Sequence, residues 1–295
     1  MIHNLSDLVE KTKNKPKCRL AVAAAEDEHV LMSLKTAVEE GIVEPVLVGD
    51  KTEIEKIAQS IGFNIENIRI IDNREGAFVS AQKAVELVKQ GEADILMKGF
   101  VNTGELLKAV LDKENGLRKA QVLSHVAFFE SPYYHKLLCV TDVAMNIAPD
   151  LDTKTLIIEN AVEACHRIGI DVPKVAVVAA VETVNHKMEA TVHAAELKAM
   201  QWHDCMVDGP FAIDIAVNKE AAEHKGILSE VAGDCDIILA PDIEAGNMFY
   251  KALNFLGGAT SAAVIMGAAA PIVLTSRSDN EKSKFLSIAL AAAMQ

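Results

Sequence analysis

Short apolar runs alternate along the chain with longer segments in which apolar residues recur at helical spacing. In the first hundred residues the runs 20–25, 44–48, 68–71 and 94–97 predict strands, and the segments 27–40, 51–61 and 74–90 predict helices, followed by a helix at 102–111. Strands that alternate with helices are typical of a parallel sheet with helical crossovers. We therefore expect an α/β fold.

This rhythm stops between residues 112 and 136, a stretch that contains Gly116, the basic pair Arg118-Lys119 and the step Ser131-Pro132. It then resumes, with strands predicted at 137–141, 174–181, 205–208, 237–240 and 262–266 and helices at 152–168, 188–200 and 245–256. A domain boundary is expected in or just after the interrupting stretch.

The composition argues against a membrane-spanning, a secreted and a nucleic-acid-binding protein. No apolar run approaches the roughly 18–20 residues that span a membrane. The N-terminal residues lack the pattern of a secretory signal, so a cytoplasmic location is expected. The net charge of −13 argues against nucleic acid as a partner, because nucleic-acid binding needs clustered lysine and arginine.

Metal chemistry is not expected from the sequence. The five cysteines form no CxxC pair and look like reduced core residues, and no HExxH motif occurs. His186 and His193, with Glu182 and Glu189, recur at near-helical spacing. That spacing suits a metal site, but a solvated helix face is the favoured interpretation.

The segment 269–279 has the pattern of an anion site. Residues 272–274 predict a buried parallel strand, and Ser278 or Asp279 can cap the helix that follows. Ser276 and Arg277 lie at the junction. Unpaired N–H groups at a helix start favour negative charge, and the Arg277 guanidinium matches phosphate oxygens bidentately.

Polar groups also follow four other predicted strands. They are Lys98-Gly99 with Thr103, Asp142 with Asn146, Asp208-Gly209-Pro210 with Asp214, and Gly246-Asn247 with Tyr250 and Lys251. Each is weak alone: Asp-Gly-Pro, for example, is above all a turn signal. The Gly-Asn pair opens a helix and would let a ligand approach the backbone closely.

Taken together, the order and spacing of these motifs resemble the phosphate acyltransferase family, which includes phosphotransacetylases and phosphate butyryltransferases. The likeness is densest from Asp208 to Arg277. It implies a two-domain, three-layer α/β architecture related to isocitrate and isopropylmalate dehydrogenases, with an interdomain cleft. The C-terminal strand and helix would return to the first domain, giving domains of residues 1–133 plus 267–295 and 134–266.

The resemblance also implies a reaction. An acyl group would pass reversibly between coenzyme A and inorganic phosphate, so the partners are acyl-CoA, phosphate and acyl phosphate. Coenzyme A is a substrate, and neither a metal nor a redox cofactor is expected. A homo-oligomer is expected as well. The chain length and the segment Ser276-Arg277-Ser278-Asp279 look more like the butyryl than the acetyl branch, with acetyl or broad acyl specificity as the alternative.

Catalytic roles carried over from the family fall on the anion segment. Arg277 would hold phosphoryl oxygens and Ser276 would donate to the developing oxyanion. Acetyl-transferring relatives carry an aspartate seven residues after the serine, and this chain has Ser283 there. Asp279 is the candidate that could replace it as a base, with Glu281 as a second choice.

Substrate binding is expected from the remaining polar motifs. Lys108 stands where relatives tend to have an arginine, and it keeps the charge without the bidentate fork. The full set of predicted substrate-binding residues is Lys98, Thr103, Lys108, Asp142, Asn146, Asp208, Asp214, Gly246, Asn247 and Lys251.

Two alternatives belong to other classes. An NAD(P)-dependent decarboxylating dehydrogenase shares the implied fold, but the chain has no G-x-G-x-x-G fingerprint and no clustered arginines with a paired-aspartate metal site. A non-catalytic ligand-binding protein of the same fold is the other. The presence of Ser276-Arg277 and Gly246-Asn247 argues against it.

Overall fold

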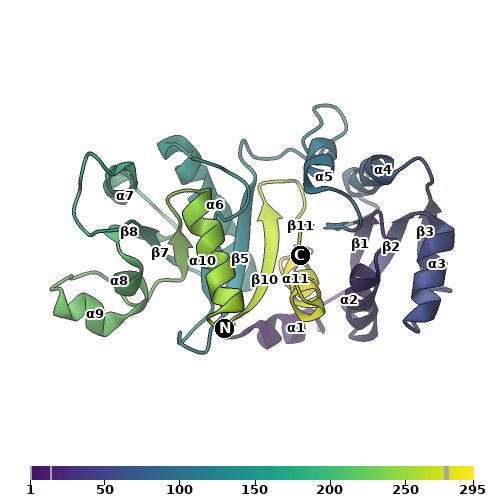
Figure 1. The fold of residues 1–295 in the computed structure, drawn as a ribbon, viewed down its shortest axis with the longest axis horizontal. Helices are drawn as coiled ribbons and strands as arrows, with labels where there is room; N and C mark the ends of the chain where they lie inside the picture. The colour runs from purple at the N-terminus through teal and green to yellow at the C-terminus, as the bar shows by residue number, and fades with distance from the viewer. Residues whose placement is uncertain (1, 14, 276–278) are drawn as a thin grey trace. The chain divides into compact units, whose positions relative to one another are not determined.

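The chain forms two compact units in a computed structural model that describes residues 2–13, 15–275 and 279–295. The terminal unit comprises Ser6–Gln121 and Ala262–Gln295, and the central unit comprises Met1–Leu5 and Val122–Ser261. Strands and helices alternate in both (Figure 1), which confirms the α/β class. The division into domains made from the sequence stays a prediction.

The terminal unit holds strands in the order β3-β2-β1-β4-β11-β10. Neighbours from β3 to β11 are parallel, and β11 is antiparallel to β10. The strands are β1 (Cys18–Ala23), β2 (Val43–Gly49), β3 (Arg69–Asp72), β4 (Ile95–Lys98), β10 (Thr260–Met266) and β11 (Ile272–Val273). The helices are α1 (Leu5–Lys13), α2 (Glu28–Glu39), α3 (Lys51–Ser60), α4 (Ala77–Lys89), α5 (Thr103–Val110) and α11 (Glu281–Ala293).

The chain adds strands first on one side of β1 and then on the other. From β1 the chain steps through α2, β2 and α3 to β3, and then α4 carries it back to β4 on the other side of β1. Right-handed crossovers therefore place α2 and α3 on one face of the strands and α4 on the other. The packing agrees, because α2 contacts α3 and α11 whereas α4 contacts α5 (Figure 1). The chain thus leaves β1 and β4 toward opposite faces, which opens a crevice at their carboxyl ends.

Local sequence explains where these helices begin. Side chains of aspartate or asparagine accept a backbone N–H in the first turn of several helices, at Asp27, Asp50 and Asn280 in this unit, as expected for N-caps. The cap of α11 is Asn280, whose Oδ1 accepts from the Ser283 N–H at 2.8 Å. The expectation that Asp279 caps this helix was wrong by one residue, and Ser278 lies outside the described residues.

Gly99 is fixed by the close approach of two strands. Its N–H donates to the carbonyl oxygen of Ala23 at 2.9 Å. A Cβ at this position would lie 2.1 Å from the carbonyl oxygen of Ala24. Only glycine allows β4 to end against β1 at this spacing.

The central unit holds strands in the order β5-β6-β9-β7-β8. β5 is antiparallel to β6, and the other neighbours are parallel. The strands are β5 (Ser124–Glu130), β6 (Leu138–Thr141), β7 (Lys174–Val178), β8 (Met206–Phe211) and β9 (Ile237–Leu239). The helices are α6 (Leu151–Ile168), α7 (Glu189–Ala199), α8 (Ile213–Val217), α9 (Lys219–His224) and α10 (Ile243–Phe255).

The same change of direction occurs in this unit. The chain moves from β6 through α6, β7 and α7 to β8, and α8 and α9 then return it to β9, which lies between β6 and β7. Right-handed crossovers place α6 and α7 on one face of these strands and α8 with α9 on the other. The direction of the chain reverses beside the neighbouring strands β6 and β9, so a second crevice is expected at their carboxyl ends.

Two segments differ from the sequence prediction. β5 lies inside the stretch 112–136 that seemed to interrupt the alternation, because its glycine, basic and proline signals flank a strand that is itself buried. The turn predicted at Asp208-Gly209-Pro210 lies within β8. β8 is last in its strand order, and an edge strand tolerates proline. Gly209 is needed because a Cβ there would lie 2.5 Å from the carbonyl oxygen of Val177.

The predicted core role of the cysteines is confirmed: all five thiols are buried and free of disulfides. Among the residues that the structure describes, no helix is long and apolar enough to cross a membrane.

An ion cluster ties the amino-terminal side of β9 to β6 and β7. The Asp234 carboxylate accepts from the Lys174 ammonium at 2.7 Å and from His135 Nε2 at 2.8 Å. Lys136 lies 3.1 Å from Asp234 and 2.7 Å from Asp236. Burial alone would raise the pKa of Asp234, but hydrogen bonds from Lys174, His135 and Lys136 lower it well below its ordinary value.

The Gly99 contact predicts a matched pair of substitutions. Gly99→Ala should destabilise the protein by about 1–3 kcal/mol, because the new methyl group meets backbone that cannot move independently. Gly104, in the first turn of α5, has open space around the Cβ position. Gly104→Ala should be neutral or stabilise by up to about 1 kcal/mol. Urea midpoints measure both, and equal midpoints for the two variants would contradict the close approach.

The Asp234 cluster predicts an acid-sensitive contribution to stability. Because the folded-state pKa is lowered, the stabilisation is present above the unfolded-state pKa of about 3.9 and declines as pH falls through the folded value. The stability gap between wild type and Asp234→Asn should therefore be largest near neutral pH and shrink below about pH 4. Urea unfolding at a series of pH values measures it, with the exposed Asp171 changed to Asn as control. A gap that does not vary with pH would contradict the prediction.

Candidate active site

A small pocket occupies the crevice at the carboxyl ends of β1, β4 and β11. Its volume is about 190 Å³. Its walls come from the loop after β1 and the start of α2, the end of β4, the residue before the 276–278 segment, and α11. The lining residues are Asp27, His29, Val30, Lys98, Gly99, Phe100, Thr275 and Lys284.

Two lysines contribute amines to this pocket, and Asp27 contributes a carboxylate. Lys98 ends β4, and its Nζ donates to the Gly99 carbonyl oxygen at 3.2 Å. Lys284 lies in the first turn of α11, and its Nζ donates to the Asp279 carbonyl oxygen at 2.5 Å. Two amines in so small a volume suit an anion of the size of a phosphate or carboxylate group.

Lys284 is held in an environment that disfavours its charged form. The residue is 4% exposed, and burial lowers the pKa of its ammonium, an effect that attraction to Asp279, Asp27 and Glu281 opposes only in part. A helix N-terminus also disfavours a cation. The amine therefore loses its proton more readily than an ordinary lysine.

A second group of predicted residues meets at the carboxyl ends of β6 and β9 in the central unit. Asp142 is 4% exposed, and its two carboxylate oxygens accept from the backbone N–H groups of His125, Ala144, Met145 and Asn146 at 2.8–3.2 Å. The Asn146 side-chain amide donates to Asp142 at 2.6 Å and to the Leu123 carbonyl oxygen at 2.9 Å. Both side chains shape the loop after β6, and their role in substrate binding stays a prediction.

Gly246 and Asn247 attach the start of α10 to that loop. A Cβ on Gly246 would lie 2.9 Å from the Asp142 carbonyl oxygen. The Asn247 amide donates to the Val143 carbonyl oxygen at 3.1 Å. The backbone that approaches this glycine is therefore the chain's own, where the sequence pattern predicted close approach of a ligand.

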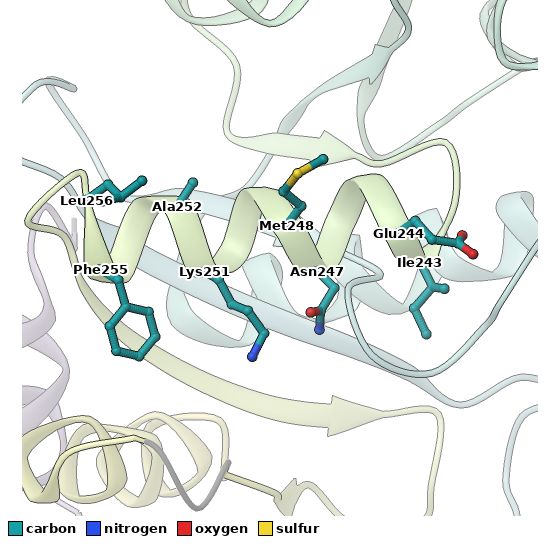
Figure 2. Close-up of a pocket in the computed structure, with 8 residues that line it drawn as sticks. All are labelled: Ile243, Glu244, Asn247, Met248, Lys251, Ala252, Phe255 and Leu256. Atoms are coloured by element: carbon teal, nitrogen blue, oxygen red, sulfur yellow. The ribbon is translucent and has the colours of Figure 1, made fainter.

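Lys251 lies one turn beyond Asn247 on the same helix. Figure 2 shows Asn247, Lys251 and Phe255 pointing to one side of α10, and all three line a cavity of about 820 Å³. Phe255 is 64% exposed. This side of the helix thus presents an amine beside open apolar surface.

The other predicted binding residues line neither the Lys98 pocket nor the loop after β6 in their own units. Asp208 and Asp214 pair with lysines of their own unit, Lys198 at 2.6 Å and Lys225 at 3.6 Å. The Lys108 Nζ lies 5.1 Å from the centre of the Phe78 ring, in a groove between α4 and α5 that is distinct from the Lys98 pocket. Thr103 is exposed at the start of α5.

The predicted catalytic pair lies outside the described residues. Ser276 and Arg277 follow Thr275, which lines the Lys98 pocket. Asp279, the third predicted catalytic residue, contributes its carbonyl oxygen as the acceptor for Lys284. Sequence reasoning missed Lys284, because a lysine at the start of a helix normally faces solvent.

One other interpretation was wrong in part. His193 does not belong to a solvated face: its side chain is 13% exposed, and Nδ1 lies 3.0 Å from Nζ of the buried Lys154. Glu182 instead pairs with Lys225 at 3.0 Å.

Comparison with known proteins agrees with the motif pattern. The family model for phosphate acetyl/butaryl transferase matches residues 4–83 and 78–292. A phosphate butyryltransferase of Clostridium acetobutylicum is 46% identical, over 99% of this chain and 98% of the relative. A phosphate acetyltransferase of Thermotoga maritima is also 46% identical, over 98% of each chain.

A solved structure agrees as well. The branched-chain phosphotransacylase from Enterococcus faecalis V583 has a TM-score of 0.84 and 34% identity, over 94% of this chain and 98% of that one. The family match spans nearly the whole sequence and includes the strand ends that form both crevices. This chain therefore belongs to the phosphate acetyl/butaryl transferase family.

Proposed function

We propose that this chain is a phosphate butyryltransferase, which transfers a butyryl group reversibly between coenzyme A and inorganic phosphate. The observation that carries the proposal is the pocket at the ends of β1, β4 and β11, where Lys98 and Lys284 converge beside Thr275. Thr275 leads directly into the Ser276-Arg277 pair of the family pattern. Relatives of this family that catalyse acyl transfer between coenzyme A and phosphate match the chain over almost all its length.

The chemistry matches the charges of the pocket. The thiolate of coenzyme A attacks the carbonyl carbon of the acyl phosphate, the carbonyl oxygen gains negative charge, and the C–O bond to phosphate breaks. Lys98 supplies a cation for the phosphoryl oxygens, and Arg277 would add a bidentate fork. Ser276 would donate to the developing oxyanion.

Much of the remaining rate acceleration would come from positioning the two substrates. Two substrates must be held together, and an enzyme gains most in such a reaction by ordering them. We propose that Lys251, beside open apolar surface on α10, and the loop that Asp142 organises contribute to binding in the central unit. Thr103, Lys108, Asn146, Asp208, Asp214, Gly246 and Asn247 remain proposed members of the binding set.

The length of the acyl group is the finer part of the proposal. Relatives named for butyryl and for acetyl transfer share the same 46% identity with this chain, so overall identity does not separate them. The chain length near 300 residues and the segment 276–279 support the butyryl branch. No metal or redox cofactor enters the proposed reaction, and we propose a cytoplasmic homo-oligomer.

The dehydrogenase alternative is not favoured, because the chain belongs to an acyltransferase family. Magnesium-dependent reduction of NAD(P) by the purified protein would reopen it.

Chain-length preference can be measured directly. Release of free thiol from butyryl-CoA and from acetyl-CoA is followed in the presence of phosphate. We expect kcat/KM for butyryl-CoA to exceed that for acetyl-CoA by about tenfold or more, because each methylene in an apolar pocket is worth about 1–3 kcal/mol. A preference for acetyl-CoA would assign the chain to the acetyl branch, and no thiol from either substrate would refute acyl transfer.

Arg277→Ala should lower kcat by about 10²–10³-fold and weaken phosphate binding while the fold is kept, since it removes the guanidinium that stabilises the leaving phosphate. Arg277→Lys should restore only part of the rate, because it returns the charge without the fork. The exposed Arg74, which pairs with Asp72 at 3.6 Å, provides the control Arg74→Ala. Steady-state kinetics and circular dichroism test the set, and near-normal turnover of Arg277→Ala would disprove the role.

A further inference from the structure

The proposed reaction needs a group that accepts one proton and donates it again, and the roles predicted for Ser276 and Arg277 do not include this transfer. The thiol of coenzyme A must lose a proton to become a strong nucleophile. The phosphate that leaves an acyl phosphate gains a negative charge on the oxygen that was bonded to carbon, and that oxygen must gain a proton. One group that accepts the first proton and donates it to the second site would serve both needs.

The position that holds an aspartate in acetyl-transferring relatives cannot supply this group. Ser283 stands there, and its backbone N–H is bonded to the Asn280 cap. A hydroxyl has too high a pKa to take a proton from a thiol unaided. The neighbouring residue on α11 is Lys284, which lines the pocket beside Lys98 and Thr275.

The charged groups around Lys284 come from α2, β4, α11 and the loop before α11. Asp27 caps α2 by accepting the Val30 N–H at 2.9 Å. His29 on α2 and Glu281 on α11 lie 3.5 Å apart. Lys98 lies at the end of β4, and Asp279 precedes α11.

These neighbours have opposite effects on the protonation of the Lys284 amine. The carboxylates favour an ammonium, whereas Lys98, the N-terminus of α11 and burial favour the neutral amine. Burial is the largest effect, so the pKa of Lys284 lies below its ordinary value. Such a group can change its protonation state during turnover, as a general acid and base must.

We propose that Lys284 relays the thiol proton of coenzyme A to the phosphate oxygen that leaves the acyl group. The neutral amine accepts the proton, the sulfur–carbon bond forms, and the carbon–oxygen bond to phosphate breaks with its electron pair on oxygen. The ammonium then donates the proton to that oxygen. Acyl-CoA and hydrogen phosphate are released, and the amine is neutral again.

The fold holds Lys284 in place for this exchange. Its Nζ donates to the Asp279 carbonyl oxygen, and the residue lines the pocket beside Lys98 and Thr275. α11 packs on α2 and β11, which fixes the first turn of the helix against the strand ends. Protonation also adds a second cation beside Lys98 at the moment when the phosphate gains charge. In the reverse direction phosphate gives its proton to the amine, and the ammonium protonates the departing thiolate.

The inference rests on the proposed function and is tested by a pH profile. The substitution Lys284→Met keeps the length of the side chain and removes the proton acceptor. With butyryl phosphate and coenzyme A, kcat/KM for coenzyme A should fall by about 10²-fold near pH 7. The deficit should shrink by about tenfold per pH unit toward the thiol pKa of about 8.5, because thiolate from solution then replaces the missing base.

The neighbouring lysine provides the matched control. Lys282 is exposed on the same helix, and Lys282→Met should leave rate and pH profile unchanged. Lys284→Gln retains a donor for the Asp279 carbonyl oxygen, so it should restore thermal stability without restoring the pH profile. Added methylamine should recover part of the activity of Lys284→Ala.

The outcomes separate the two proposals. Lys284→Met with a wild-type pH profile, or with a loss that is equal at all pH values and not rescued by amine, would overturn the relay. A profile that changes with Asp279→Asn but not with Lys284→Met would assign the proton to Asp279 and would also overturn it. Wild-type protein that releases no thiol from butyryl-CoA would refute the proposed function itself.

Discussion

Parallel pairing of β1 with β4 is the interaction on which the candidate site depends. The register runs from Leu20 opposite Ile95 to Ala23 opposite Lys98, so both strands end at the same edge. The helices that follow them lie on opposite faces, because α2 packs on α3 whereas α5 packs on α4, and the strand ends stay open between them. Gly99 allows this pairing to continue to its last residue, because any side chain there would strike the backbone of β1.

Under the proposed function, the crevice must hold anionic substrates within an acidic protein. The chain carries a net charge of −13, so its overall field repels phosphate, and the attraction must be local. In the proposed site Lys98 supplies a cation, and Lys284 becomes a second one when it takes up the thiol proton, within a pocket of about 190 Å³. Lys284 is also an exception to the usual distribution of charge in helices, because it lies in the first turn of α11, where the helix dipole disfavours a cation. Local rules are most often broken where function requires it.

In the central unit, polar residues and a glycine that follow the strand ends hold a loop in place. Asp142 and Asn146 hold a loop through hydrogen bonds to backbone groups, and Gly246 lets that loop approach α10. These residues shape the loop after β6, and their role in substrate binding stays a prediction. Lys251 is exposed on α10, on the same side of the helix as Asn247 and Phe255 (Figure 2).

The sequence by itself determined the alternation of strands and helices, the glycine at the end of β4 and the family motifs, because these depend on residues that are neighbours along the chain. It did not determine β5, whose flanking turn signals hid a buried strand, or the cap at Asn280. Only the tertiary structure decided the environment of Lys284. The burial and charges of that amine come from α2, β4 and the Asp279 loop, segments that folding brings together across more than half of the sequence.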